Sequence, residues 1–201
     1  MFTAAPIVLA PHIYVLKNYA DARVLLPLIH SIAAQAPFRH MTVPGGLAMK
    51  VALTNCGDLG WTSDARGYRY APKDPASGLP WPALPTAFFE LGQAAAAACG
   101  FEGFAPNACL VNCYAAGTGM GAHQDRNEKD FSQPIVSVSV GAPCRFFWGG
   151  LLRTDKTTSV VLEEGDVMVW GDAARLVYHG VRPLPEGSAV RHNITLRRAV
   201  L

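Results

Sequence analysis

The sequence predicts a mainly β domain with flanking helices, in which the strands form a sandwich or a barrel. Two observations support this prediction. From residue 108 onward, short segments rich in β-branched and aromatic residues alternate with Gly and Pro turns. Before them, two segments place apolar side chains at helical spacing. A chain of 201 residues is long enough to bury a sizeable core, so we expect residues 1–201 to form a single domain.

Two helices are expected in the first half of the chain. The first covers Tyr19–Gln35, with Asp21 near its start. The second covers Thr86–Cys99 and lies between Pro85 and Gly100, which are residue types favoured at the start and just beyond the end of a helix. Its run of alanines predicts a close-packing face.

Residues 37–85 separate the two helices and are rich in Gly, Pro, Asn, Asp and aromatic residues. One strand is expected there, at Met49–Thr54. A long segment rich in turns is typical of a functional loop layer or of a linker, and its aromatic residues argue against a linker. Side chains such as Trp61 and Tyr68 either hold the loops to the core or form a recognition surface.

Short strands are expected throughout the second half of the chain. The clearest alternation sets valines at positions 136, 138 and 140 against serines at positions 137 and 139. The expected strands are Ala108–Tyr114, Pro134–Val140, Cys144–Trp148, Thr157–Leu162, Asp166–Trp170, Leu176–His179 and Arg191–Arg197.

Composition excludes several classes of protein. A chain that is 50% hydrophobic and 16% charged is neither disordered nor a coiled coil. A net charge of +2 gives no bulk electrostatic argument for nucleic-acid binding. No apolar run is long enough to span a bilayer, and Met1–Ala10 lacks the pattern of a signal peptide. The five cysteines form no C-x-x-C pair and are expected to be reduced thiols, so we expect a cytoplasmic protein that does not contact membranes.

The sharpest chemical signal is His123-Gln124-Asp125, which is followed by His179 more than fifty residues later. Residues two apart in an extended segment point to the same side, so His123 and Asp125 can present an imidazole and a carboxylate to one point. A histidine from a distant strand would complete a facial triad that leaves three metal positions open. Non-haem Fe(II) oxygenases use this arrangement, but zinc hydrolases use similar ligands, so the three residues alone do not identify the metal.

The last predicted strand, Arg191–Arg197, places both its arginines, Asn193 and Thr195 on one face. Two guanidinium groups in an apolar domain favour an anionic ligand such as a short dicarboxylate, although an exposed strand face would also accommodate them. Asn112 and Tyr114 share one face of an earlier strand, where they either line a polar pocket or form ordinary hydrogen bonds in the core. Taken with the metal motif, these strands favour Fe(II) chelated by a 2-oxo dicarboxylate.

The sequence closely resembles the AlkB family of Fe(II)- and 2-oxoglutarate-dependent dioxygenases, which repair alkylated nucleobases. The resemblance runs from about Pro37 to Ala199. It rests on short motifs spread over this range, namely Pro37-Phe38-Arg39, Thr54-Asn55-Cys56-Gly57, Leu59-Gly60-Trp61-Thr62, Pro80-Trp81-Pro82, His123-Gln124-Asp125, Pro134-Ile135-Val136-Ser137-Val138-Ser139, Gly165-Asp166-Val167, Tyr178-His179-Gly180 and the alternating Arg191, Asn193, Thr195 and Arg197.

The resemblance implies a double-stranded β-helix (jelly-roll) core over residues 108–199, covered by a nucleotide-recognition lid over residues 37–85. It also implies Fe(II) as the metal and 2-oxoglutarate and O₂ as co-substrates. In such enzymes His123, Asp125 and His179 would bind the iron.

The resemblance assigns five further residues to 2-oxoglutarate. Arg191, Asn193 and Tyr114 would hold one end of it, with Asn112 and Arg197 toward the end that chelates the metal.

Four residues would contact the substrate. Trp61 would stack on a flipped base opposite His123, Tyr68 would contact the nucleic-acid backbone, and Arg153 matches a further position on the substrate side. Asn127 occupies a position that is acidic in the bacterial relative and faces the damaged base there. An amide can accept a hydrogen bond from an exocyclic amino group, but it cannot offset the positive charge of 1-methyladenine or 3-methylcytosine.

The implied reaction is oxidative demethylation of 1-methyladenine and 3-methylcytosine in DNA, a direct-reversal repair that releases formaldehyde and converts 2-oxoglutarate to succinate and CO₂. The expected substrate is alkylated single-stranded DNA, with duplex DNA and RNA as alternatives, and the expected oligomeric state is a monomer. Two other interpretations stay open. The same iron and co-substrate can serve a protein, lipid or small-molecule substrate, and a jelly-roll can bind a metal or an anion without turnover.

Overall fold

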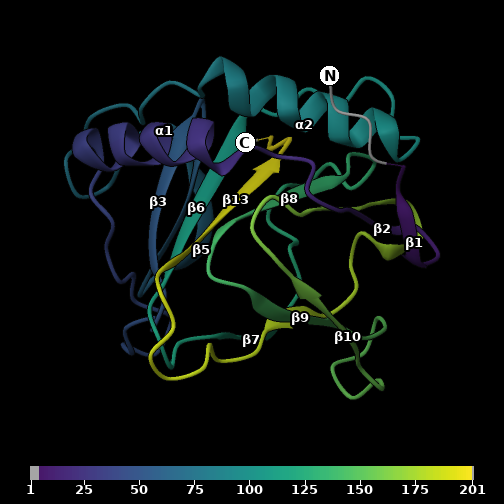
Figure 1. The fold of residues 1–201 in the computed structure, drawn as a ribbon. Helices are drawn as coiled ribbons and strands as arrows, with labels where there is room; N and C mark the ends of the chain where they lie inside the picture. Colours follow the sequence, from purple (N-terminus) through teal and green to yellow (C-terminus); the bar gives the residue numbers. More distant parts are fainter. Residues whose placement is uncertain (1–4, 201) are drawn as a thin grey trace.

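Two antiparallel sheets face one another at the centre of the molecule, and two helices lie together along one side (Figure 1). The computed structural model describes residues 5–200, so the first four residues of the Met1–Ala10 segment and Leu201 lie outside the described residues. Within that range the larger sheet has seven strands, in the order β1 (Ile7–Ala10), β2 (Ile13–Leu16), β11 (Val167–Trp170), β8 (Ile135–Gly141), β13 (Arg191–Arg197), β6 (Ala108–Tyr114) and β3 (Ala52–Gly57).

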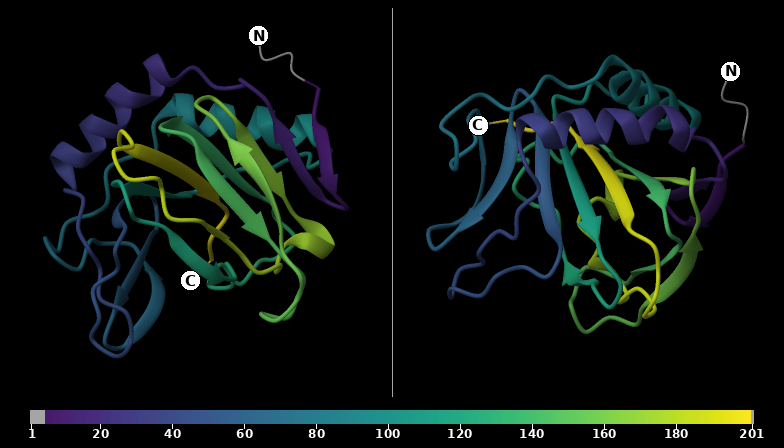
Figure 2. Two further views of the ribbon diagram at one scale, coloured as in Figure 1. Left: turned by 60° about the horizontal axis from the view of Figure 1, so that its bottom comes forward. Right: turned by 60° about the vertical axis from the view of Figure 1, so that its left-hand side comes forward.

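The smaller sheet has four strands across the described chain, in the order β10 (Thr158–Leu162), β9 (Cys144–Trp148), β12 (His179–Val181) and β7 (Met120–His123). A separate hairpin is formed by β4 (Gly60–Asp64) and β5 (Gly67–Ala71). Figure 2 shows both helices on one side of the larger sheet, with the smaller sheet on the other. The predicted mainly β class with flanking helices is confirmed.

The two predicted helices are α1 (Ala22–Gln35) and α2 (Thr86–Ala98). Helix α1 begins after Asp21, whose side chain accepts a hydrogen bond from the backbone N–H of Arg23 and so caps the helix. Helix α2 is followed by Gly100, whose φ of +87° suits a residue without a Cβ atom. Among residues 5–200, no helix is both long enough and apolar enough to cross a membrane.

The helices cover an apolar face of the larger sheet. Alternate residues of β8 and β13, such as Val138 and Ile194, are fully buried against them. This core contains Leu25, Ile29, Ile32, Phe88, Leu91, Ala95, Val111, Val136, Val138, Val140, Val167, Val169, Ile194 and Leu196. A second core fills much of the space between the two sheets and contains Ile13, Val15, Leu110, Ile135, Phe146, Trp148, Met168 and Trp170.

Two strand predictions are wrong in position. The strand expected at Met49–Thr54 starts at Ala52, because the backbone N–H of Met49 instead donates to Met41 O, 2.8 Å away, in the preceding loop. The strand expected at Leu176–His179 only begins at His179. The chain before it is still turning after the short 3₁₀ helix η1 (Asp172–Ala174), and Val177 N donates to Ala174 O.

The described chain contains five strands that the sequence analysis did not predict: β1, β2, β4, β5 and β7. Each has only four or five residues, which is too short for a clear alternating pattern. Within residues 37–85, β3 pairs with β6 in the larger sheet, whereas β4 and β5 pair only with each other. The segment therefore contributes both a sheet edge and a separate two-stranded hairpin, which the side chain of Asn55 in β3 connects to the larger sheet through hydrogen bonds with the backbone of Trp61.

Candidate metal and anion site

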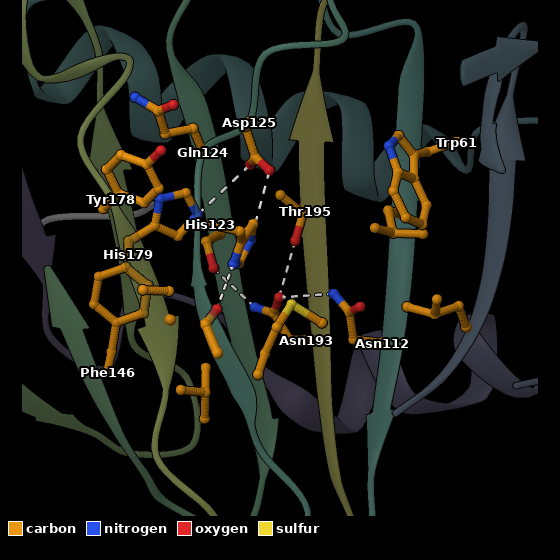
Figure 3. Close-up of a pocket in the computed structure, with 18 of the residues that line it drawn as sticks. Trp61, Asn112, His123, Gln124, Asp125, Phe146, Tyr178, His179, Asn193 and Thr195 are labelled. Atoms are coloured by element: carbon orange, nitrogen blue, oxygen red, sulfur yellow. Dashed lines mark hydrogen bonds and ion pairs between the residues drawn. The ribbon is translucent and has the colours of Figure 1, made fainter. Parts of the chain in front are cut away.

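His123, Asp125 and His179 converge between the two sheets (Figure 3). His123 ends β7 and His179 begins β12, and the two residues are partners across these antiparallel strands. Nε2 of His123 lies 3.7 Å from Asp125 Oδ1, and Nε2 of His179 lies 3.8 Å from Asp125 Oδ2. All three ligand atoms lie within 4.8 Å of one another, so the group can hold one metal ion.

Backbone carbonyls orient both imidazoles. His123 Nδ1 lies 2.9 Å from Gly121 O, and His179 Nδ1 lies 3.1 Å from Val177 O. A carbonyl oxygen can only accept, so each Nδ1 carries the proton and each Nε2 presents a lone pair to the shared point. Burial lowers the pKa of His179 to about 4, which keeps this imidazole neutral near pH 7.

Asp125 is held as a carboxylate by its surroundings. Burial alone would raise its pKa, but the guanidinium of Arg197 and then the two imidazoles hold the pKa well below its usual value. Arg197 Nη2 donates to Asp125 Oδ2 at 2.6 Å. The structure thus places Arg197 directly beside the metal-binding group.

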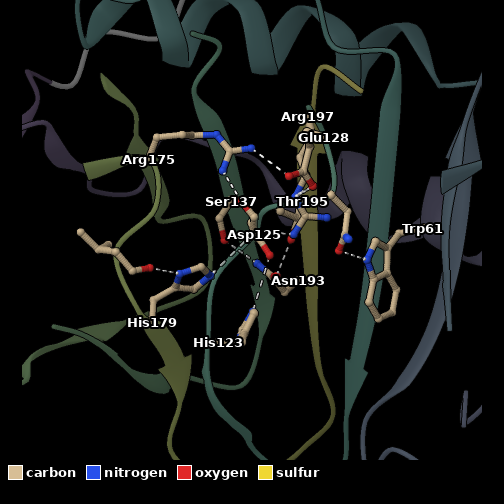
Figure 4. A network of polar contacts seen from close by, with 12 residues as sticks. Trp61, His123, Asp125, Glu128, Ser137, Arg175, His179, Asn193, Thr195 and Arg197 are labelled. Atoms are coloured by element: carbon tan, nitrogen blue, oxygen red, sulfur yellow. Dashed lines mark hydrogen bonds and ion pairs between the residues drawn. The ribbon is translucent and has the colours of Figure 1, made fainter. Parts of the chain in front are cut away.

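A buried polar network fixes the loop that carries Asp125 (Figure 4). Arg175 Nη1 donates to the backbone carbonyl of Asp125 at 2.6 Å, its Nε donates to Gln133 O at 3.1 Å, and its Nη2 donates to Glu128 Oε2 at 3.1 Å. Glu128 Oε1 accepts a second hydrogen bond, of 2.7 Å, from the Tyr70 hydroxyl. Arg175 and Glu128 are both only 1–2% exposed, and sequence reasoning missed both of them.

A cavity of about 520 Å³ contains the metal-binding group. Its wall includes every residue proposed from the sequence for the metal, 2-oxoglutarate or substrate. Besides the group itself these are Trp61, Tyr68, Asn112, Tyr114, Asn127, Arg153, Arg191, Asn193 and Arg197. The structure therefore brings together side chains from both sheets, the β4–β5 hairpin and two loops.

Arg191 is a buried cation with no acidic partner among residues 5–200. Its Nη2 donates to Ser139 Oγ at 3.0 Å and its Nη1 to Ala142 O at 3.4 Å, while its buried Nε has no acceptor in the described part of the chain. A buried charge without a counter-charge is costly, so this part of the cavity favours an anion. A carboxylate of 2-oxoglutarate fits this requirement.

Amide side chains continue the polar wall beside Arg191. Asn193 Nδ2 donates to Ser137 Oγ at 2.8 Å, and Asn112 Nδ2 donates to Asn193 Oδ1 at 3.2 Å. The buried Oδ1 of Asn112 accepts no hydrogen bond from the described residues. Tyr114 lies opposite Arg191 in the β6–β13 pairing, and its side chain is fully buried.

An aromatic pair on the β4–β5 hairpin forms the cavity wall that faces His179. The rings of Trp61 and Tyr68 are stacked, with centroids 5.5 Å apart and planes 16° apart. Trp61 Nε1 donates to Asn127 Oδ1 at 3.2 Å. Figure 3 shows Trp61 across the cavity from His179. Arg153 Nη1 donates to Ala122 O at 2.6 Å, next to His123.

Three further wall residues had not been singled out from the sequence. Trp170 packs against His179, with ring centroids 5.1 Å apart, and Phe146 packs against both of these rings, with centroid distances of 5.8 Å to His179 and 5.9 Å to Trp170. Gln124 donates to Leu176 O at 2.7 Å. The position of Gln124 inside the His123-Gln124-Asp125 motif is the only sequence signal that could have pointed to any of them.

Comparisons with known proteins agree with this geometry. The model of the 2OG-Fe(II) oxygenase superfamily matches residues 12–197. The alpha-ketoglutarate-dependent dioxygenase AlkB of Salmonella typhimurium is 48% identical over 95% of this chain and 92% of its own length. The nucleic acid dioxygenase ALKBH1 of Homo sapiens is 39% identical over 51% of this chain and 27% of its own length.

The fold has a counterpart among solved structures. The structure of OsALKBH1 superimposes with a TM-score of 0.84 at 25% sequence identity, covering 96% of this chain and 99% of the other. The predicted jelly-roll fold and the use of Fe(II), 2-oxoglutarate and O₂ are confirmed. The chain belongs to the AlkB family within the 2OG-Fe(II) oxygenase superfamily, and it is an Fe(II)- and 2-oxoglutarate-dependent dioxygenase.

Proposed function

We propose that this dioxygenase repairs nucleic acid by removing N-alkyl groups from bases such as 1-methyladenine and 3-methylcytosine. One methyl group, one 2-oxoglutarate and one O₂ are consumed in each turnover. The products are the unmodified base, formaldehyde, succinate and CO₂. Damage is therefore reversed directly, without cutting the strand.

The main support for this proposal is the set of residues that line one cavity. It combines the His123, Asp125 and His179 group, the unpaired guanidinium of Arg191 and the aromatic face of Trp61. Metal, dicarboxylate and planar base each find chemically suitable side chains there. The AlkB relative, and the similar human protein named a nucleic acid dioxygenase, support a nucleic-acid substrate.

His123, Asp125 and His179 would hold Fe(II) through two Nε2 atoms and one carboxylate oxygen. When bound, Fe(II) with 2-oxoglutarate and O₂ supplies the oxidising chemistry that breaks the C–H bond of the methyl group. The backbone carbonyls behind the two imidazoles keep their Nε2 lone pairs turned toward the metal. Arg197 keeps Asp125 ionised and in place.

Five residues would position 2-oxoglutarate. Arg191 would pair with its distal carboxylate, beside Asn193 and Tyr114, and Asn112 and Arg197 would lie toward the end that chelates the metal. The buried Nε of Arg191, which has no acceptor among residues 5–200, supports the assignment of Arg191, because a carboxylate can accept from a guanidinium.

A target base must leave its stack to reach the metal, and stacking in the cavity offsets part of that cost. Trp61 would form one face of the base site and His123 the other. Tyr68 at the rim would contact the nucleic-acid backbone, and Arg153 would lie at a further position on the substrate side. Residues 37–85 would serve as the recognition lid over the core of residues 108–199, with the β4–β5 hairpin as its central part.

The proposal includes single-stranded DNA as the preferred substrate, action as a monomer and a cytoplasmic location. The five cysteines form no disulfide, which supports a reducing compartment. A net charge of +2 supports modest affinity for the backbone and a shallow salt dependence.

The test mixes iron-loaded protein with 2-oxoglutarate, ascorbate and a single-stranded oligonucleotide that carries 1-methyladenine. Formaldehyde release with restored adenine is the expected result. Succinate formed without any change in the oligonucleotide would indicate a protein, lipid or small-molecule substrate instead. If no succinate forms, the proposed catalytic function is wrong.

A further inference from the structure

Asn127 stands at the base end of the cavity, two residues after Asp125. The orientation of its side-chain amide follows from its contact with Trp61. The indole N–H of Trp61 can only donate, and it lies 3.2 Å from the side-chain oxygen of Asn127. The amide nitrogen is therefore turned away from the indole, and no residue in the range 5–200 accepts a hydrogen bond from it. Asn127 thus offers N–H donors to a ligand.

Among the wall residues that the structure describes, none offers a free carboxylate to a cationic base. Asp125 is the only acidic side chain among the described wall residues, and it is bonded to Arg197. Glu128 follows Asn127 directly, but its carboxylate is buried between Arg175, Tyr70 and Arg197. It cannot turn toward the cavity without leaving two buried arginines short of a partner.

Two wall residues carry positive charges that no carboxylate of residues 5–200 pairs with. Arg126 and Arg153 belong to the cavity wall, and neither forms an ion pair within the described part of the chain. A base that carries a positive charge would meet these guanidinium groups without an opposing carboxylate. A neutral base avoids that repulsion, and a base with a carbonyl group can also accept from the amide nitrogen of Asn127.

We propose that Asn127 selects uncharged N-alkylated bases, which have a carbonyl group at C4 of a pyrimidine or C6 of a purine, over cationic bases that have an amino group at the same carbon. The inference rests on the proposed function and narrows its substrate class. The favoured class includes 3-methyluracil, 3-methylthymine and 1-methylguanine. 3-Methylcytosine and 1-methyladenine remain substrates of the proposed reaction, but with weaker binding and a lower kcat/KM than the favoured class.

The experiment compares 3-methyluracil and 3-methylcytosine in the same single-stranded oligonucleotide, because these bases differ at one exocyclic group and by one charge. Each is assayed for kcat/KM and, separately, for equilibrium binding to the protein. The variant is Asn127→Asp. Its carboxylate can still accept from Trp61 Nε1, so the change replaces the donor and adds a negative charge while the indole keeps its partner.

Wild-type protein is expected to bind the 3-methyluracil oligonucleotide more tightly. Asn127→Asp should shift both the binding ratio and the kcat/KM ratio toward 3-methylcytosine by about ten- to a hundredfold, the range for a hydrogen bond to a charged group. The control is Gln93→Glu, which makes the same amide-to-acid change on the exposed side of α2 and should leave both ratios unchanged.

Tighter wild-type binding of 3-methylcytosine, or a binding ratio that Asn127→Asp does not move, would overturn the inference. The binding ratio tests it even if neither oligonucleotide is demethylated. Absence of demethylation for both bases would instead contradict the proposed function, so the two failures are distinguishable.

Discussion

The two faces of the larger sheet are formed by the same strands, but the side chains on each face have different kinds of partner. On the helix side, Val138 and Ile194 pack against α1 and α2 and are no more than 1% exposed. On the cavity side, the neighbouring Ser139 and Asn193 form hydrogen bonds around Arg191 and Asn112. The first face is complete within the protein. As far as residues 5–200 show, the second face retains the buried guanidinium of Arg191 without an acidic partner, and buried polar atoms without hydrogen-bond partners.

This difference separates two ways of stabilising one sheet. Apolar packing explains the helix face without reference to any ligand. The cavity face makes physical sense only when a metal and an anion are added, because unmatched buried charges cost free energy. Substitutions on the two faces should therefore affect different measurements.

The largest effect is expected at the metal-binding group. Asp125→Asn removes an anionic ligand while it keeps the volume of the side chain, and demethylation should fall by at least about a thousandfold. Circular dichroism would check that the variant still folds despite the loss of the Arg197 partner. Folded protein with normal turnover would contradict the metal assignment.

On the helix face, Ile194→Ala should lower the free energy of unfolding by about 2–5 kcal/mol, because it leaves a cavity in a close-packed core. The KM for 2-oxoglutarate should not change. Urea unfolding and steady-state kinetics measure the two quantities. Val190→Ala, at an exposed position just before β13, is the matched control and should change stability by less than about 0.5 kcal/mol. A raised KM in Ile194→Ala would show that the two faces are not independent.

On the cavity face, Arg191→Met should raise the KM for 2-oxoglutarate by about ten- to a hundredfold, through loss of a charged hydrogen bond. The ligand-free protein should stay as stable as the wild type or become more stable, because a buried charge without a counter-charge is removed. Thermal unfolding with and without 2-oxoglutarate separates the two effects. Strong destabilisation of the ligand-free variant would mean that Arg191 is satisfied by the protein alone.

A further effect is expected in the pH dependence of the stability of the metal-free protein. Burial lowers the pKa of His179 from 6.5 to about 4, so the unfolded chain takes up a proton first as the pH falls. Stability should therefore decrease between pH 6.5 and pH 4. His192 on the helix face also has a lowered pKa, caused by burial and then by His30. This shift likewise decreases the stability of the protein as the pH falls.

The contribution of His179 can be isolated with His179→Gln. Urea unfolding across this pH window should give a shallower slope for the variant than for the wild type. Equal slopes would show that His179 does not titrate abnormally in the fold.

Regular alternation made several strands of both sheets predictable. Strands β6, β9 and β13 have the predicted bounds, and the alternation in β13 correctly separates its arginines from Ile194 and Leu196. Strand β12 was misplaced because Leu176 and Val177 resemble strand residues but continue the turn after η1. Local sequence pattern does not report where a turn ends.

The metal-binding group was predictable because two of its members are separated by a single residue. Other contacts in the site do not correspond to any local sequence pattern. Arg175 and Glu128 are 47 residues apart, and Trp61 and Asn127 are 66 residues apart. Hydrogen bonds between such distant residues have no periodicity, so only the folded chain reveals them.

Arg175 also sets a limit for protein engineering. Its guanidinium binds the backbone at Asp125 and at Gln133, and so spans the loop that carries both a candidate metal ligand and Asn127. A designer who wants to change the range of accepted bases can vary Asn127 or Trp61 only while Arg175 and its Glu128 partner are retained. A related scaffold that receives the Asp125–Gln133 loop would also need buried residues equivalent to Arg175 and Glu128. Without them, the loop would bring the new specificity but would not hold the metal ligand in place.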